Sequence, residues 1–568
     1  MAAGLAAVLL ALLVPRWISI FTESINWDEF TMLARVDRTL RLGDVDGGGR
    51  PGLVTLILTP FLRHCVDAVT TAVQARILWQ LITLAYLCGV FFLVRNWFRF
   101  SRRPENGYLE GAAAVALLAF LPAFVAWSVQ VRSDQAALAA AVWGGVCLLS
   151  ERRRLAVVAG LLFGLALLCT QKAVYPAALC GLLWAMAVLN RLKEPSQVSR
   201  NSELAARVGQ ALLIGLCAAA TLAIYAYLVP KTANLVDKGT VVSAWEEMRL
   251  ARARVGYRAY TIEATRAPLH ILLFVTLIIT SGRAILRRAY GDYSLLGACW
   301  AVLLLGMAVA VFHGSSYPYF VMTVGLFPAI ALGMASGHLA RFLGKSRRAI
   351  VGLAFLSLVL GSVPITLEML DGSQANQRDT MRWIKASGLD AHQGFQVDGA
   401  LICLTESDPI PPLSHQINMG QLSPTAFDDL IAEFRRRQLA YVVDLGQLNQ
   451  FPKTVQRFWA DHYHWYNGSV SVAGFDIKPG SVGLNVDVIS PGLYRWVPFP
   501  RTQEVTLVVD GTAVPAMGSV PLAVGPHRLS TRPSGFAGVL VRAIDLPAGE
   551  EVYRFIDPNQ LDRLYGVR

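Results

Sequence analysis

The sequence predicts a polytopic α-helical membrane protein with a soluble C-terminal tail. Apolar residues make up 54% of the 568 residues and charged residues only 16%, which is far from the composition of an ordinary soluble enzyme. Apolar runs of about 16–21 residues recur as far as residue 366, and each is long enough to cross a hydrocarbon core of ~30 Å as a helix. Beyond residue 370 the pattern stops, so the last part of the chain is expected to lie outside the membrane.

About eleven membrane spans are expected. They cover residues 3–21, 77–94, 109–127, 134–150, 155–171, 173–190, 209–229, 267–282, 294–312, 317–337 and 349–366. The first span is interpreted as a retained helix rather than a signal peptide, because it lacks a basic n-region and no small-residue cleavage site precedes Trp27. Residues 1–367 are therefore predicted to form a transmembrane domain.

Basic residues cluster in alternate connections between the spans. Every even-numbered span is followed by several Arg or Lys side chains, whereas the short odd-numbered connections hold little more than Arg132 and Lys172. Because cytoplasmic loops carry an excess of Lys and Arg, the N-terminus is predicted to be cytoplasmic and the tail extracytoplasmic. This placement accounts for the net charge of +12 without nucleic acid as a partner.

Two loops on the predicted outer side are long. In the first, residues 22–76, a glycine-rich stretch is followed by a short apolar run, Leu53–Leu62, which suits an interfacial or re-entrant helix. The second, residues 230–266, contains more basic than acidic side chains, against the topological bias. Two explanations remain open: the flanking helices dictate the orientation, or the basic residues meet an external anion such as a lipid phosphate.

The tail is predicted to contain two modules. Residues 368–485 alternate between helical and strand patterns and form an α/β domain, with a capping box at Thr425–Asp428 and a strand at Ala440–Val443. Residues 486–568 are rich in strands and turns and are expected to form a small β-sandwich. Its strongest signals are a strand entering a tight turn at Val505–Gly511, a hairpin at Val520–Leu529 and a strand at Phe536–Ile544.

The eight cysteines predict neither a disulfide framework nor a metal site. Six lie within apolar runs, no CxxC spacing occurs, and only Cys65 and Cys403 fall outside the spans.

An acidic pair, Asp28 and Glu29, follows Trp27 directly after the first span. Carboxylates at a membrane boundary are costly to desolvate, so they are solvated, paired or used for chemistry. An ordinary wet loop explains them equally well by itself. However, Arg50, the Arg132–Ser133–Asp134 segment, Lys172 and the turn from His313 to Tyr319 are predicted to lie on the same side.

Each of these residues also has an ordinary explanation. Interfacial anchoring accounts for Tyr317 and Tyr319, and snorkelling accounts for Arg132 and Lys172. It is the convergence of acids and cations on one face that predicts a shared extracytoplasmic pocket.

Four short segments carry a resemblance to a known family. They are Asn26–Phe30, Gly49–Gly52, Arg132–Asp134 and Tyr317–Tyr319. In this order, with many spans and an external tail, they resemble the GT-C glycosyltransferases. The most similar branch contains the protein-mannosyltransferases, the aminoarabinose transferases and the bacterial RgtA/B/C/D-like proteins. Two departures occur: the Lys-Pro-Pro of many relatives is Arg50-Pro51-Gly52 here, and no Tyr shortly follows Asp28-Glu29. The identity of the donor sugar therefore does not follow.

The resemblance implies an inverting transfer of sugar from a polyprenyl-phosphate-linked donor. Asp28 would be the general base, and Glu29 and Asp134 would orient cations, which we favour over holding a divalent metal. The resemblance also implies which residues would contact the substrates. Arg50, Arg132, Lys172, Lys231 and Arg266 would stabilise the leaving phosphate, and Trp27, His313, Tyr317 and Tyr319 would line the pocket.

The acceptor would be a glycan, a lipid or a protein. The arginine- and alanine-rich composition suggests a bacterial inner membrane, with the tail in the periplasm; the oligomeric state is not indicated. Two alternatives are a transporter or flippase of lipid-linked glycans and a non-catalytic glycan-assembly subunit of the same fold. A transporter would require repeated segments or charges deep inside the helices, whereas the charges are expected to gather at one end of the spans.

Overall fold

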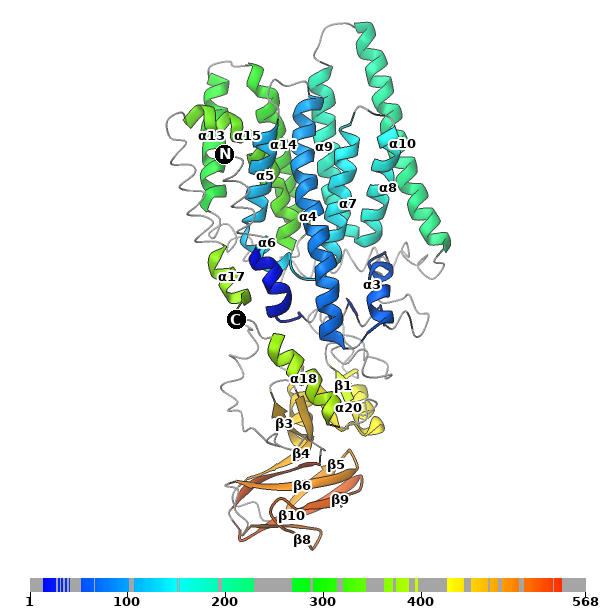
Figure 1. Ribbon diagram of the computed structural model, residues 1–568, viewed down its shortest axis with the longest axis vertical. Helices are drawn as coiled ribbons and strands as arrows, with labels where there is room; N and C mark the ends of the chain where they lie inside the picture. The colour runs from blue at the N-terminus through cyan, green and yellow to red at the C-terminus, as the bar shows by residue number, and fades with distance from the viewer. Residues whose placement is uncertain are drawn as a thin grey trace. The chain divides into compact units, whose positions relative to one another are not determined.

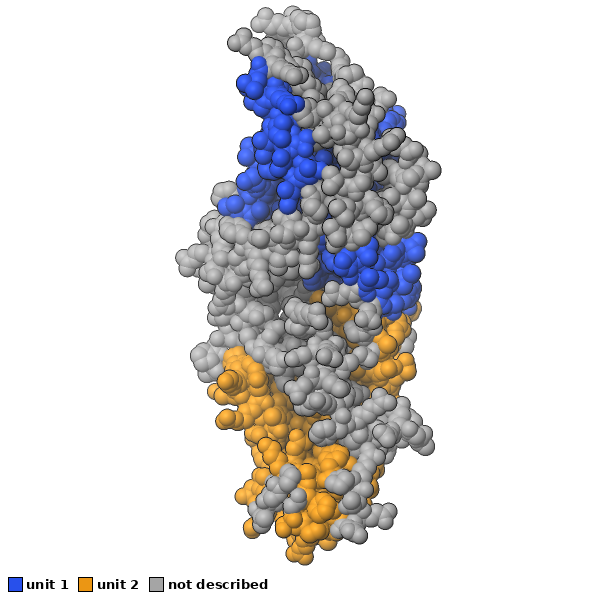
Figure 2. Space-filling model, turned by 90° about the vertical axis from the view of Figure 1, so that its left-hand side faces the viewer, with its two compact units in different colours: residues 1–23, 42–60, 73–372 blue, residues 24–41, 61–72, 373–568 orange. Residues whose placement is uncertain are grey.

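The computed structural model divides into two units, coloured separately in Figure 2. Unit 1 consists of residues 1–23, 42–60 and 73–372, and unit 2 of residues 24–41, 61–72 and 373–568. Unit 2 thus combines the tail with two short pieces of the first long loop. The structure describes residues 14–26, 29–30, 32–33, 36–37, 40, 53–65, 67–101, 107–150, 152, 154–192, 197–228, 268–286, 290–313, 320–343, 362–370, 374–387, 394–396, 426–443, 451–467, 470–478, 483–499, 505–534 and 536–543.

Unit 1 is built from helices (Figure 1). Residues 14–22 are helical and precede the labelled elements. These are α3 (Leu53–Arg63), α4 (Ala68–Phe100), α5 (Tyr108–Ala119), α6 (Pro122–Trp127), α7 (Ser133–Leu148), α8 (Arg154–Cys169), the short 3-10 helix η1 (Gln171–Ala173), α9 (Val174–Arg191), α10 (Gln197–Leu228), α13 (Pro268–Leu286), α14 (Tyr290–His313), α15 (Val321–Leu343) and α17 (Val363–Leu370). Helices α3 and α4 each have a few residues in unit 2.

Four segments of these described helices are long and apolar enough to cross a membrane: Ala68–Phe100, Gln171–Arg191, Ser202–Tyr225 and Ser294–Val311. Four shorter apolar helices accompany them: Tyr108–Ala119, Arg154–Cys169, His270–Leu286 and Val321–Gly337. Most of the predicted spans therefore coincide with apolar helices. The number eleven stays a prediction, since most of spans 3–21 and 349–366 lies outside the described residues, as does loop 230–266. The short run after the glycine-rich stretch is helix α3.

Helix α4 begins at Ala68 rather than at the predicted residue 77. Hydropathy excluded its first turns because they contain polar residues such as Arg76, whereas the helix start is determined by a cap. The Asp67 Oδ1 accepts a hydrogen bond from the Thr70 backbone N–H at 2.8 Å, and such a cap satisfies a donor that the helix leaves unpaired.

The predicted span 109–127 is broken into two helices, α5 and α6. Pro122 has no N–H to continue the ladder, so the helix ends just before it. The break exposes two carbonyl groups, and both find a donor far away in sequence. The Arg16 Nη2 donates to the Ala119 carbonyl at 2.8 Å, and the Ser362 Oγ donates to the Phe120 carbonyl at 3.3 Å. A broken helix among apolar helices needs such partners, because no water replaces them there.

Small residues allow close packing of α8 against α10. A Cβ added at Gly160 would lie 2.5 Å from the Cys217 Cβ, and one at Gly164 would lie 2.6 Å from the Thr221 Cβ. The two glycines are four residues apart, which places them on one face of the helix. Any larger residue at either position would push α8 and α10 apart.

Unit 2 contains three labelled helices and two β-sheets (Figure 1). The helices are α18 (Gln374–Ala386), α20 (Ala426–Arg437) and α21 (Lys453–His462). The strands are β1 (Gly394–Gln396), β2 (Tyr441–Val443), β3 (Tyr463–Asn467), β4 (Val470–Ile477), β5 (Leu484–Val488), β6 (Gly492–Phe499), β7 (Thr506–Val509), β8 (Thr512–Val514), β9 (Ser519–Leu522), β10 (Gly525–Arg532) and β11 (Ala537–Arg542).

The larger sheet has the order β1-β2-β4-β11-β6-β9, with β3 paired to β4, and the smaller sheet has the order β5-β10-β7-β8. Only β1 and β2 are a parallel pair; the other described pairs are antiparallel. The predicted strands at 440–443 and 536–544 are confirmed as β2 and β11. Thr425 of the predicted capping box lies outside the described residues; α20 begins at Ala426.

The predicted tight turn after Val505–Val509 is confirmed. Strands β7 and β8 pair as a hairpin, and Asp510 and Gly511 at its turn have φ angles of 48° and 88°. Positive φ at both positions matches the twist of a two-residue hairpin.

The predicted hairpin at Val520–Leu529 is wrong. Strand β9 pairs with β6, and β10 pairs with β5 and β7 in the other sheet. A short Gly- and Pro-containing connection serves equally for a hairpin and for a step from one sheet to the other, so the local signal did not separate them.

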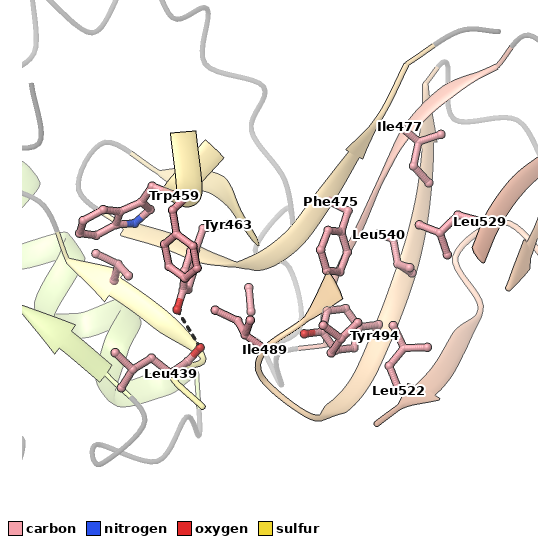
Figure 3. Packing of buried hydrophobic residues seen from close by; sticks show 14 of the residues in the cluster. Leu439, Trp459, Tyr463, Phe475, Ile477, Ile489, Tyr494, Leu522, Leu529 and Leu540 are labelled. Carbon is pink, nitrogen blue, oxygen red and sulfur yellow. Dashed lines mark hydrogen bonds between the residues drawn. The ribbon is translucent and has the colours of Figure 1, made fainter. Parts of the chain in front are cut away.

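One hydrophobic core joins α20, α21 and both sheets of unit 2 (Figure 3). The rings of Phe475 on β4 and Tyr494 on β6 stack with centroids 6.2 Å apart. The Tyr463 hydroxyl, at the other end of the cluster, donates to the Leu439 carbonyl at 3.1 Å. The larger sheet and the hydrophobic core therefore include residues from both sides of the domain boundary predicted near residue 485. Whether the two sides fold independently is not tested, so the boundary stays a prediction.

Candidate functional site

The predicted site residues divide between the two units and the undescribed segments. Arg132, Asp134 and Lys172 belong to unit 1, and Glu29 belongs to unit 2. His313 is the last residue of α14, and its side chain is outside the description. The remaining predicted residues lie outside the described residues: Trp27, Asp28, Arg50, Lys231, Arg266, Tyr317 and Tyr319.

Within unit 1, the structure brings Lys172 and Asp134 together. The Lys172 Nζ lies 3.6 Å from the Asp134 Oδ2, and these side chains are 25% and 7% exposed. Asp134 is in the first turn of α7, and Lys172 is in η1 at the start of α9. Their predicted positions at the same end of two spans are therefore correct. The nearly buried carboxylate holds the ammonium group in place, while part of the Lys172 side chain stays exposed.

Two aromatic rings lie beside Lys172. Its Nζ lies 5.5 Å from the centroid of the Phe320 ring, and that ring meets Tyr175 edge-on at 6.0 Å. A cation over an aromatic face is stabilised by the ring quadrupole. The Thr170 Oγ1 accepts from the Lys172 backbone N–H at 3.4 Å, which caps η1. Lys172 is thus fixed at both its backbone and its ammonium group.

Arg132 lies in the connection between α6 and α7, and α4 holds this connection. The Trp79 Nε1 donates to the Arg132 carbonyl at 2.7 Å, and the Gln80 Nε2 donates to the Ser128 carbonyl at 2.9 Å. Both bonds are buried. The backbone of 128–132 therefore has a defined path despite being outside any helix.

The Arg132 side chain is buried and ordered by its neighbours. Its Nε donates to the Gln130 Oε1 at 3.0 Å, and its guanidinium lies 4.9 Å from the centroid of the Trp127 ring. The Gln130 Nε2 in turn donates to the Glu23 Oε1 at 3.4 Å. This chain of contacts links the connection before α7 to the end of the first helix.

The sequence prediction missed Arg76, a second buried arginine at the same connection. It is fully buried, and its Nη1 donates to the Glu23 carbonyl at 2.8 Å. Glu23 thus contacts Arg76 through its backbone and Gln130 through its side chain. Arg76 was assigned to a loop because the predicted span began at residue 77; the polar cap at Asp67 was the signal that could have extended the helix to include it.

We call Arg76, Arg132 and Lys172 of unit 1 the cation cluster. Gln130 and Glu23 connect Arg132 with Arg76, and Asp134 pairs with Lys172. The start of α7, with Arg132 as its N-cap, adds the positive end of a helix dipole, which attracts anions. The arrangement is suited to binding an anion.

Glu29, in unit 2, has a structural contact of its own. Its Oε2 accepts from the Asn26 backbone N–H at 3.0 Å, while the Asn26 carbonyl accepts from the Glu29 and Phe30 N–H groups. This reciprocal pattern closes the first turn of a helix. The Glu29 side chain is fully buried, so this contact accounts for at least one of the predicted acids without chemistry.

Two findings bear on metals and thiols. Among the residues that the structure describes, no group of three or more His, Cys, Asp or Glu side chains is placed to hold a metal ion. Cys65 is disulfide-bonded, whereas the six cysteines of the apolar runs are free. The prediction that the cysteines form no disulfide framework made no allowance for this bond at Cys65.

Comparison with known proteins gives similarities in structure but not in sequence. No protein-family model matches the chain, and no curated protein matches it by sequence. The crystal structure of ArnT from Cupriavidus metallidurans bound to undecaprenyl phosphate is similar with 15% identity and a TM-score of 0.43, over 83% of this chain and 98% of that chain. The cryo-EM structure of the arabinosyltransferase EmbB from Mycobacterium smegmatis is similar with 12% identity and a TM-score of 0.37, over 96% of this chain and 63% of that chain.

Proposed function

We propose that this chain is a membrane glycosyltransferase that moves a sugar from a polyprenyl-phosphate-linked donor to an acceptor hydroxyl on the extracytoplasmic face. The cation cluster is the observation that carries the proposal. Lys172 lies at the start of α9, Arg132 in the connection before α7 and Arg76 within α4. An anionic lipid head group would be bound by these cations. Arginine suits bidentate contact with phosphate, and lysine supplies a compact charge.

In the proposed reaction the acceptor oxygen attacks the anomeric carbon of the donor sugar. The bond from that carbon to the phosphate oxygen breaks, and its electron pair leaves with the phosphate. Asp28 takes the proton of the acceptor hydroxyl. Because the acceptor attacks in a single displacement, opposite the leaving phosphate, the anomeric centre is inverted. Charge grows on the phosphate as the bond breaks, and preorganised cations stabilise it most at that moment. Asp134 would keep Lys172 oriented for this task, in agreement with its 3.6 Å contact.

The extracytoplasmic placement has support from a second feature. Cys65 belongs to the first long loop and is disulfide-bonded. Disulfides form and persist in oxidising compartments such as the bacterial periplasm and are rare in the cytosol. The same loop was assigned to the outer side from the distribution of basic residues, so two independent observations favour one orientation. The tail would then be periplasmic, and the acceptor a glycan, a lipid or a protein of the cell envelope.

A transporter of lipid-linked glycans is the second candidate, and one observation favours it. Arg16 is buried within the first predicted span, although the charges were expected to gather at one end of the spans. Its hydrogen bond to the Ala119 carbonyl and its position 4.9 Å from the Phe124 ring centroid give it a structural task. We therefore favour the transferase.

The substitution Asp28→Asn tests the transferase. A strain that lacks the protein should lose one sugar from a surface glycan, lipid or protein, as measured by mass spectrometry. The wild-type chain should restore that sugar, and the Asp28→Asn variant should not, although it reaches the membrane in equal amount. Asp44→Asn, an acid of the same loop outside the matching segments, is the control and should restore it. Full restoration by Asp28→Asn would refute the assignment. Accumulation of an unflipped glycan on the cytoplasmic leaflet in the deletion strain would favour the transporter.

A further inference from the structure

Helix α18, the first helix of the tail, contacts the loop that carries the acidic pair. The contacts lie within unit 2, which contains residues 24–41 and 61–72 together with the tail. Gln377 on α18 forms two hydrogen bonds with one residue of the loop. Its Oε1 accepts from the Ile25 N–H at 2.7 Å, and its Nε2 donates to the Ile25 carbonyl at 2.9 Å.

This pairing resembles one rung of a β-ladder in which a side-chain amide replaces a peptide group. Only an amide can serve both bonds, because it offers one acceptor and one donor in a plane. Ile25 and Gln377 are both buried, so water does not compete for these backbone groups. Removing the amide would leave a buried N–H and a buried C=O of Ile25 without partners.

The contact at Ile25 lies close to the acidic pair in the sequence. Ile25 lies three residues before Asp28. On the other side of Asp28, Glu29 closes the helix turn through the Asn26 N–H at 3.0 Å. The described residues on both sides of Asp28 are thus held, one by α18 and one by the turn itself.

The same helix meets the other end of the loop. The Lys385 Nζ lies 3.7 Å from the Asp67 Oδ2, and Asp67 caps α4 by accepting from the Thr70 N–H. The apolar face of α18 between these points is buried, with Met381 and Ile384 nearly inaccessible. Helix α18 therefore contacts both ends of a loop of more than forty residues.

We infer that Gln377 is a positioning residue for the acidic pair, and that α18 makes the tail part of the machinery that places this pair. The expected effect on the rate of transfer rests on the proposed function, whereas the expected effect on the order of the loop does not. A general base must lie within hydrogen-bond reach of the proton that it removes. A loop that loses its anchor three residues before that base would spend less time in the productive arrangement.

The first test needs no activity. In the full-length protein, hydrogen exchange of the peptide covering residues 24–30 should become faster in Gln377→Met, which keeps the volume of the side chain and removes the amide. Exchange in strand β6, at the centre of the tail, should remain unchanged. The matched control is Arg382→Ala on the same helix, since Arg382 pairs only with the exposed Asp379 at 2.8 Å among the interactions described for it. Unchanged exchange at 24–30 in Gln377→Met would overturn the inference whatever the protein catalyses.

The second test is kinetic. Gln377→Met should lower kcat by ~10–10²-fold, the size of effect expected when a reacting group is slightly misplaced. Binding of polyprenyl phosphate should keep its wild-type stoichiometry and affinity, because the cation cluster is untouched. A loss of binding sites in proportion to the loss of rate would mean partial unfolding and would overturn the positioning role. A wild-type rate in Gln377→Met, with Asp28→Asn inactive, would overturn it while leaving the proposed function intact.

Gln377→Glu supplies a rescue. An ionised carboxylate can accept from the Ile25 N–H but faces the Ile25 carbonyl without a donor, whereas the protonated acid can form both bonds. Burial favours the neutral form. The ratio of the variant rate to the wild-type rate should therefore rise as the pH falls from about 8 to about 5.5. Titration of Asp28 changes both rates in the same way, so it cancels in the ratio. A ratio that does not change with pH would count against the pairing.

Discussion

One ion pair of unit 1, Lys172 and Asp134, and one of unit 2, Arg435 and Asp487, differ in their exposure as well as in their separation. Lys172 and Asp134 in unit 1 are 3.6 Å apart, with the carboxylate only 7% exposed. Arg435 and Asp487 in unit 2 are closer, at 2.5 Å, but 48% and 42% exposed. Desolvation makes a nearly buried charge depend on its partner, whereas water screens an exposed pair. The longer contact is therefore expected to matter more, and separation alone does not rank ion pairs.

The largest expected effect is on sugar transfer in unit 1. Lys172→Met should lower the rate of transfer by ~10²–10³-fold, the loss typical when one preorganised group facing developing charge is removed. Lys172→Arg should retain part of the rate because it keeps the charge. The rate of sugar transfer is measured on purified protein, with equal amounts of each variant set by its intrinsic tryptophan fluorescence. Arg435→Met in unit 2 is the matched control and should leave transfer unchanged. Equal losses of transfer rate in Lys172→Met and Arg435→Met would contradict a special role for the pair in unit 1.

The next effect concerns the hydrophobic core of unit 2. Leu540 on β11 is fully buried in the core that joins both sheets (Figure 3). Leu540→Ala should lower the free energy of unfolding by ~2–5 kcal/mol, since it removes apolar contacts and leaves a cavity. Denaturant unfolding followed by tryptophan fluorescence, with Trp496 as a buried reporter in the same core, measures it. A change below ~1 kcal/mol would mean that the core is less important than its burial indicates.

A smaller effect is expected at the exposed pair itself. Asp487→Asn should change the free energy of unfolding by no more than ~1 kcal/mol, the usual range for exposed ion pairs. The same denaturant experiment applies, and added salt should reduce the difference further, because exposed charges are screened. A salt-independent loss of several kcal/mol would show that Arg435 and Asp487 behave like a buried pair.

The smallest effect is a dependence of stability on pH at the β7–β8 turn. Burial lowers the pKa of His527, but hydrogen bonds to Asp510 and to the Ala523 carbonyl outweigh it and leave the pKa raised. The pKa of Asp510 is lowered, chiefly by the Arg528 backbone N–H and then by His527. The histidine contributes stability below about pH 6.5 and loses it as the pH rises through its folded pKa. The aspartate contributes above about pH 3.9 and loses it as the pH falls.

The pair is therefore expected to stabilise the tail most between about pH 4 and about pH 6.5. The difference in Tm between the wild type and His527→Ala should be greatest in that window and should shrink on both sides. Asp510 is also held by the Arg528 N–H at 2.8 Å, so part of its contribution should survive in the variant. A difference that grows steadily above pH 7 would contradict the sign of the His527 shift.

Much of unit 1 could be predicted because membrane helices obey a local rule. Length and apolarity located most helices, and the alternation of basic loops placed Arg132, Asp134 and Lys172 at one end of them. That Lys172 pairs with Asp134 in particular was not predicted and is seen only in the structure. The break at Pro122 was also within reach, since a proline inside an apolar run ends a helix.

The rest depends on contacts between residues that are distant in sequence. Nothing near Gln377 indicates that its amide pairs with Ile25, and nothing near Gln130 indicates that it links Arg132 to Glu23. The prediction of a β9–β10 hairpin was wrong for the same reason. The turn residues were recognised, but the strands that pair with β9 and β10 come from elsewhere in the chain. Position along a helix can be predicted locally, whereas the choice of partner cannot.

The two carbonyl groups at the α5–α6 break have a consequence for biosynthesis. Their donors come from Arg16, near the start of the chain, and from Ser362, almost 250 residues after the break. During synthesis α5 and α6 enter the bilayer long before residue 362 leaves the ribosome. One carbonyl must therefore wait, satisfied by lipid head groups, water or the insertion machinery, until the last apolar segment arrives. The bundle can be completed only after residue 362 has left the ribosome, and a chain truncated before that residue would leave the position open.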